Sequence, residues 1–158
     1  MRWGWGPLVV VALAVASCGG GSPSEEERVA QAVRDYAKAV RDRDGNALCG
    51  KLFPSSHLPP DLARKLNVPE GQPGKPSAWD RDKRECERDF RGGREFEGSQ
   101  GARVEVGRVT LGPEVRADGI SRTARVQGSF SSSKEPTTKD TVPMVKYRGD
   151  WKVVVGIN

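Results

Sequence analysis

The chain has 158 residues and a formal net charge of +5, long enough for one modest domain with its own core. Hydrophobic residues make up 35% and charged residues 30%, which is polar but excludes a wholly disordered chain. Basic residues are interspersed with acids, as in WDRDKRECERDFR at 79–91, so neither a basic face nor a nucleic-acid-binding module is visible. We expect a mixed-charge surface with no nucleic-acid partner; mild attraction to anionic lipid headgroups stays open.

Residues 1–17 are predicted to be a signal peptide. Arg2 gives a positive start, and the apolar run PLVVVALAVAS at 7–17 is shorter than the roughly 20 residues that a membrane-spanning helix needs. Small residues then precede Cys18. The sequence VASC at 15–18 resembles the lipobox of bacterial lipoproteins.

The lipobox resemblance implies cleavage before Cys18, a diacylglyceryl group on its sulfur and an acyl chain, such as palmitate, on the new amine. Two or more chains are needed for stable anchoring. Residues 18–25 are therefore expected to form a lipidated cysteine and a flexible tether, at the extracytoplasmic face of the cell membrane. An ordinary signal peptide that leaves Cys18 as a free thiol is the alternative.

Cys49 and Cys86 remain as an even pair. In an exported domain such a pair is usually a disulfide, and closing this loop would contribute about 4 kcal/mol in the chain-entropy model. A metal site is disfavoured because the sequence has no CxxC and its one histidine is His57. A redox-catalytic pair would be closer in sequence. We expect a structural disulfide, no metal and no cofactor.

Apolar residues spaced three and four apart, together with turn residues between them, predict helices at residues 25–44, 46–53, 60–66 and 78–90. Ser24 is the expected N-cap of the first helix and Gly45 is able to end it. The rest of the proline-rich segment 54–78 is expected to be loop.

After residue 100 the hydrophobic period changes to two, which predicts strands at 103–111, at 119–130 and twice within 141–157. A slip around Gly107 indicates a β-bulge. In the second strand the alternation predicts that Ile120 and Ala124 share a face. Arg148-Gly149-Asp150 is interpreted as a hairpin turn rather than an adhesion motif. Helices first and antiparallel strands last predict an α+β fold with the helices on one face of a curved sheet.

This order resembles the NTF2-like superfamily, which includes SnoaL-like and ketosteroid-isomerase-like proteins. The resemblance is carried by VRDYAKAVRDRDGNALCGKLFP at 33–54 and VKYRGDWKVVVG at 145–156, within a domain spanning 26–158. It implies a cone-shaped α+β fold whose bent antiparallel sheet and first helix enclose a pocket. Many exported bacterial lipoproteins look like this, with a cysteine pair placed like Cys49 and Cys86.

Several side chains are candidates for such a pocket, although periodicity does not separate a lining from a filled core. They are Tyr36, Trp79, Phe130, Met144, Tyr147 and Trp151.

The resemblance gives Tyr36 a catalytic alternative. Tyr36 lies eight residues before Asp44, and in ketosteroid isomerases the corresponding tyrosine donates a hydrogen bond to a developing enolate. The base's stretch is replaced here by SSHLPPDLARKL, where Asp61 is expected on a helix, and the second aspartate has no match. Core packing is therefore favoured for Tyr36.

His57 is a second catalytic candidate, since the unperturbed pKa of histidine lies near neutrality. Its sequence neighbourhood shows no nucleophile together with an orienting acid, which favours a surface histidine.

These observations predict a membrane-anchored lipoprotein that binds a small apolar ligand or an envelope protein. A non-catalytic role is favoured over an enzymatic one. The alternatives are an isomerase- or SnoaL-like enzyme using Tyr36, and a scaffolding module of an envelope complex.

Overall fold

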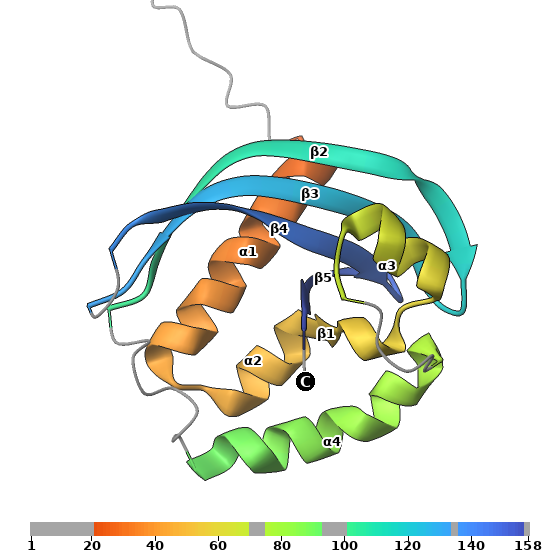
Figure 1. The fold of residues 1–158 in the computed structure, drawn as a ribbon. Coiled ribbons are helices and arrows are strands. Elements are labelled where there is room, and N and C mark those ends of the chain that lie inside the picture. The colour runs from red at the N-terminus through yellow and green to blue at the C-terminus, as the bar shows by residue number, and fades with distance from the viewer. Residues whose placement is uncertain (1–20, 70–74, 93–100, 134–135, 157–158) are drawn as a thin grey trace, which may run out of the picture.

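The computed structural model describes residues 21–69, 75–92, 101–133 and 136–156. Helices come first and a long-stranded sheet last, so the chain is an α+β protein (Figure 1). The helices are α1 (Glu25–Asp42), α2 (Gly45–Lys51), α3 (Pro60–Leu66) and α4 (Trp79–Asp89), with short 3₁₀ helices η1 (Ser55–His57), η2 (Pro76–Ala78) and η3 (Phe90–Gly92). The strands are β1 (Leu52–Pro54), β2 (Arg103–Ala117), β3 (Ile120–Ser131), β4 (Thr138–Tyr147) and β5 (Asp150–Val155).

The start of α1 follows the expected capping chemistry. Ser24 accepts a hydrogen bond from the Glu27 backbone N–H, while the Glu27 side chain accepts from the Ser24 backbone, which completes a capping box. The end of α1 differs from the expectation. Arg43 takes the left-handed conformation at φ 55°, and Gly45 instead begins α2 behind the N-cap Asp44.

The predicted helix at 46–53 is wrong at its C-terminal end. α2 stops at Lys51, and Leu52–Pro54 turn into the short strand β1, which pairs in parallel with β5. All three β1 residues are buried, so tertiary pairing rather than local propensity decides this segment.

The sheet runs in the order β1-β5-β4-β3-β2 and is open at both edges. From β2 to β5 neighbouring strands are antiparallel, as predicted, whereas the short β1 adds a parallel edge. The register slips between Val106 and Val109, which confirms the bulge expected around Gly107. β2 continues past Leu111 to Ala117 with two further slips. Arg148 and Gly149, both at positive φ, form the expected hairpin turn.

Apolar packing covers the sheet on both faces, which corrects the expectation that all helices share one face. On one side Val29 and Val33 of α1 pack in a cluster with Met144. On the other side Leu62 of α3 belongs to a cluster with Val145. In Figure 1 the strands accordingly pass between α1 and α3.

A slip between Ile120 and Arg122 moves Ile120 to the α3 side, so Ile120 and Ala124 do not share a face. The expectation from simple alternation is therefore wrong at this position, because an extra residue in a strand reverses the side-chain direction.

Over the described residues, no helix combines the length and the apolar character needed to cross a bilayer.

Candidate functional site

The cysteine pair expected to form a disulfide lies between two helices. Cys49 of α2 and Cys86 of α4 have Cα atoms 6.0 Å apart, within the range that a disulfide spans, and their sulfurs are at disulfide distance. Both side chains are buried. The pair fixes α4 against α2. Cys18, the expected lipidation site, lies outside the described residues.

The six residues expected to line a pocket do not meet in one place. Trp79 and Tyr147 belong to the cluster formed with α2, α3 and α4, whereas Met144 and Trp151 belong to the cluster under α1. Phe130 is half-buried at the edge of the second cluster, and Tyr36 packs against both clusters. The four most buried of them, Trp79, Met144, Tyr147 and Trp151, act as core side chains.

Tyr36 is half-buried on α1, and burial raises the pKa of its hydroxyl, which keeps it protonated at neutral pH. The acids that the sequence placed near it serve other purposes. Asp44 caps α2 by accepting from the Ala47 backbone N–H at 2.9 Å, and Asp61 lies exposed on α3, where it pairs with Arg64. Neither carboxylate is arranged as a base beside Tyr36.

His57 has partners that the sequence did not reveal. Its Nε2 lies 2.9 Å from Asp82 Oδ2 and its Nδ1 lies 3.2 Å from Ser56 Oγ. The pKa of Asp82 is lowered, first by the hydrogen bond from Arg81 and then by that from His57, so this carboxylate is an acceptor. In neutral His57, Nε2 therefore carries the proton and Nδ1 accepts from the Ser56 hydroxyl.

The His57 ring also makes edge contacts with Phe53 and Trp79, at centroid distances of 6.4 and 5.9 Å. The Ser56–His57–Asp82 chain can relay a proton, and it also ties η1 to α4. Asp82 was missed because it is 25 residues away in sequence and only the packing of α4 brings it to His57.

A second polar cluster fixes the start of α1 to the sheet. Glu25 Oε1 accepts a hydrogen bond from Lys146 Nζ at 2.6 Å and another from Trp151 Nε1 at 3.1 Å. The Lys146 hydrogen bond is the main cause of the lowered pKa of Glu25. Trp151, the expected pocket residue, thereby has its indole N–H satisfied by α1.

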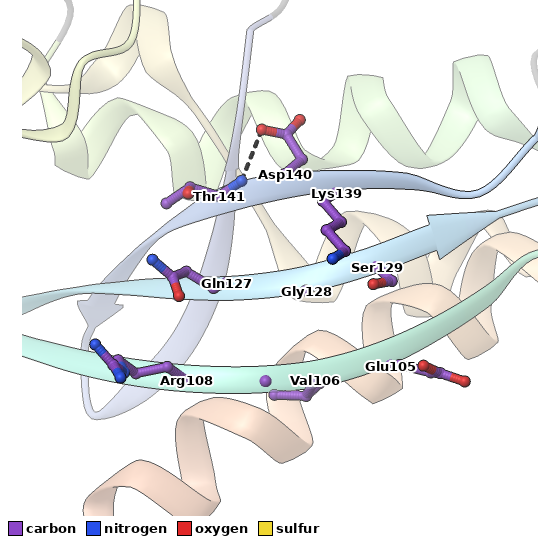
Figure 2. A pocket seen from close by; sticks show the side chains of 10 residues that line it. Glu105, Val106, Arg108, Gln127, Gly128, Ser129, Lys139, Asp140 and Thr141 are labelled. Atoms are coloured by element: carbon purple, nitrogen blue, oxygen red, sulfur yellow. Dashed lines mark hydrogen bonds between the residues drawn. The ribbon is translucent and has the colours of Figure 1, made fainter.

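An open hollow of about 540 Å³ lies on the part of the sheet where β2, β3 and β4 run side by side (Figure 2). Cross-strand neighbours form its polar surface: Glu105 is opposite Ser129, which is opposite Lys139 on β4. Gln127 is likewise opposite Thr141. Figure 2 shows these side chains on the face turned away from α1, which lies behind the strands. The hollow is lined by Glu105, Val106, Gly107, Arg108, Gln127, Gly128, Ser129, Lys139, Asp140 and Thr141.

The lining combines two cations, Arg108 and Lys139, with two carboxylates and several amide or hydroxyl groups. Such a surface offers hydrogen-bond donors and acceptors together with charges of both signs, which suits a partner that carries polar and charged groups. Among the described residues, no group of three or more His, Cys, Asp or Glu side chains is placed to hold a metal ion.

No protein-family model and no curated protein matches the sequence. Among solved structures, the chain is similar to a putative NTF2-like transpeptidase from Campylobacter jejuni, with 10% identity, 80% of this chain and 96% of that chain covered, and a TM-score of 0.39. It is also similar to an NTF2-like protein of unknown function from Pseudomonas putida KT2440, with 16% identity, 81% and 80% coverage, and a TM-score of 0.36. Both are described as NTF2-like, the class that the sequence resembles, while the α+β assignment rests on this chain's own helices and sheet.

Proposed function

We propose that this chain is a lipoprotein anchored through Cys18 at the extracytoplasmic face of the cell membrane, whose domain binds an envelope protein. The anchor rests on the short apolar leader and the VASC sequence at 15–18. The binding role rests on the polar hollow over β2, β3 and β4, where Gln127, Lys139 and Thr141 are exposed.

The placement of the aromatic side chains favours a protein partner over a small apolar ligand. Trp79, Tyr147 and Trp151 expose only 4%, 3% and 6% of their surfaces and are packed in two separate clusters. Their apolar surface is used for folding. The hollow is instead open and of mixed charge, as the rim of a protein interface is.

Fractionation of the producing cells tests the anchor. The wild-type chain should be found in the membrane fraction and should incorporate labelled fatty acid. The Cys18→Ser variant should not incorporate the label. Labelling that persists in Cys18→Ser would contradict the lipid anchor.

Site-specific photo-crosslinking in intact cells tests the binding role. A crosslinking residue in place of Gln127 should capture one defined envelope protein, and the adduct should disappear when Lys139→Glu reverses the charge of the hollow. The matched control is the same residue in place of Arg34, which is exposed on α1 away from this face. Equal capture at both positions would refute the hollow as the binding site.

Native mass spectrometry of the full chain in detergent distinguishes binding of a small apolar ligand from binding of a protein partner. A stoichiometric apolar molecule that co-purifies would favour a ligand carrier over a partner-binding protein.

The enzymatic alternative depends on the Tyr36 hydroxyl. Tyr36→Phe is expected to change stability and nothing else, because no described carboxylate is arranged as its base. Turnover of a ketone or polyketide substrate that Tyr36→Phe abolishes would establish the enzyme instead.

A further inference from the structure

Lys152 of β5 has most of its side chain removed from water. It exposes 16% of that side chain, whereas Lys51 and Lys83 each expose 40%. The Lys152 Nζ donates a hydrogen bond at 2.5 Å to the Gly50 carbonyl. That carbonyl is in the last turn of α2, for which the helix itself supplies no donor. A neutral acceptor therefore holds the Lys152 amine in place.

Two further ammonium groups lie around the same end of α2. Lys51 follows Gly50 in the chain, and Lys83 Nζ lies 3.9 Å from the position that a Cβ on Gly50 would take. Each has a carboxylate of its own, since Lys51 pairs with Asp35 at 3.1 Å and Lys83 pairs with Glu87 at 3.5 Å. Both lysines are thus held in their charged form beside the third amine.

The environment of Lys152 favours the neutral amine more than that of an exposed lysine does. Its nearest carboxylate, Asp150 Oδ2, is 3.8 Å from Nζ, which is beyond hydrogen-bond distance. The pKa of Lys152 is lowered, chiefly by burial; Asp150 opposes this shift, and the charges of Lys83 and Lys51 add to it. Desolvation and a neighbouring cation are the two ways in which proteins activate a lysine as a nucleophile toward carbonyl compounds.

An open groove of about 620 Å³ lies beside this lysine, between α1 and the start of β5. Lys152, Lys51 and Asp150 are among the residues that line it, and α1 contributes Gln31 and Asp35. Its cations are interspersed with acids, so its charge selects neither an anion nor a cation. Its amide and carboxylate groups instead offer donors and acceptors that suit a hydroxyl group, which both donates and accepts.

We propose that Lys152 is a carbonyl-capture site, at which its neutral amine reacts with a small hydroxyaldehyde bound in this groove. The nitrogen lone pair forms a C–N bond while the carbonyl π electrons move to oxygen, which takes up a proton. The nitrogen then loses a proton, and the hydroxyl leaves as water to give an imine. Asp150 is placed to carry the proton from the nitrogen to the leaving hydroxyl through water. One amine and one aldehyde give one imine and one water, with no oxidation or reduction.

Reductive trapping of the full chain in detergent tests this site. Glycolaldehyde is the probe, cyanoborohydride reduces any imine to a stable secondary amine at neutral pH, and peptide mass spectrometry measures the rate at each lysine. Lys152 should be modified about fivefold or more faster than Lys38, which exposes 66% of its side chain on α1. A Lys152 that only caps α2 should be shielded and react more slowly. Modification of Lys152 at the rate of Lys38 or below would overturn the proposal.

Variants separate the nucleophile from its activation. Lys152→Arg keeps the charge and a donor for Gly50, and should abolish the fast modification. Lys83→Gln should slow modification of Lys152 by about twofold to fivefold, because losing a nearby cation raises the pKa of Lys152 and leaves less neutral amine. Lys38→Gln, with the same change in net charge, is the matched control and should leave the rate unchanged. Equal rates in Lys83→Gln and Lys38→Gln would overturn activation by the lysine cluster.

Propionaldehyde, which lacks the hydroxyl of glycolaldehyde, tests the class of substrate. The ratio of modification at Lys152 to that at Lys38 should fall by about threefold with propionaldehyde, because a hydrogen bond in the groove is lost. An unchanged ratio would overturn the assignment of a hydroxyaldehyde. The Cys18→Ser chain should be modified like wild type, so failure of the lipid anchor and failure of this site give different results.

Discussion

Met144 and Val145 are neighbours on β4, and neither exposes any of its surface. Because adjacent residues of a strand point to opposite faces, the sheet is packed on both sides at this point. Met144 packs with α1, and Val145 packs with α2, α3 and α4. The centre of the sheet is thus the middle layer of the domain, whereas the hollow of Figure 2 lies on a part of the sheet that is open to solvent.

Because the sheet is buried on both faces, we expect both Met144 and Val145 to contribute to the stability of the fold. Met144→Ala should lower the free energy of unfolding by about 2–5 kcal/mol, and Val145→Ala by about 1.5–3 kcal/mol, because each leaves a cavity in a different cluster. Val104→Ala, on the half-buried part of β2, is the matched control and should cost less. Urea unfolding measures all three, and a tolerated Val145→Ala would contradict the packing of α3 and α4 on that face.

Two glycines of α2 should respond in opposite directions to the same substitution. A Cβ at Gly45 would lie 2.7 Å from Phe90 Cβ, so Gly45→Ala should destabilise by about 1–3 kcal/mol through overpacking. A Cβ at Gly50 would meet only Lys83 Nζ, at 3.9 Å, so Gly50→Ala should stabilise by about 0.5–1 kcal/mol through reduced chain entropy. Thermal unfolding compares the pair. Equal effects would refute close contact between α2 and the end of α4.

The Glu25–Lys146 pair should make stability depend on pH. The pKa of Glu25 is lowered in the folded state, chiefly by its hydrogen bond from Lys146, so its contribution is present above its ordinary pKa and is lost as pH falls through the folded value. Glu25→Gln should cost about 1 kcal/mol at neutral pH, since Gln still accepts from Trp151 but carries no charge.

The cost of Glu25→Gln should fade as the pH falls below the ordinary pKa of a glutamate and through the lowered folded pKa of Glu25, because the wild-type carboxylate then becomes protonated. Glu25→Ala also removes the acceptor for Trp151 and should remain destabilising at low pH. Denaturant unfolding of the three proteins across pH provides the measurement. A pH-independent cost of Glu25→Gln would show that the ion pair contributes nothing.

The pairing of Cys49 with Cys86 should account for a large share of stability. Replacing both by alanine should cost about 4 kcal/mol in the chain-entropy model for a separation of 37 residues, besides the loss of buried sulfur contacts. The single variants should behave alike and leave one free thiol each. Peptide mapping without reductant should link the two cysteines, and two free thiols in the wild-type chain would refute the disulfide.

The sequence alone predicted most of the local structure, because local structure follows from local chemistry. Spacing of three and four residues indicated α1 and α4, the Ser24 cap and its glutamates located the start of α1, and the slip at Gly107 indicated a bulge. The leader and Cys18 likewise depend on a linear pattern, and the lipid anchor remains a prediction from that pattern. Long-range packing decided the rest: the parallel strand β1, the second covered face of the sheet and the meeting of His57 with Asp82.

Charge shows most clearly what only the tertiary structure decided. In the sequence, the acids and arginines of residues 79–91 alternate and indicate a solvated surface of mixed sign. In the folded chain, partners on other elements, Arg148 and His57, engage Asp80 and Asp82, while the helical period turns Arg84 and Arg88 outward. Composition fixes the number of charges, but only the neighbours that packing supplies determine which of them remain available to another molecule.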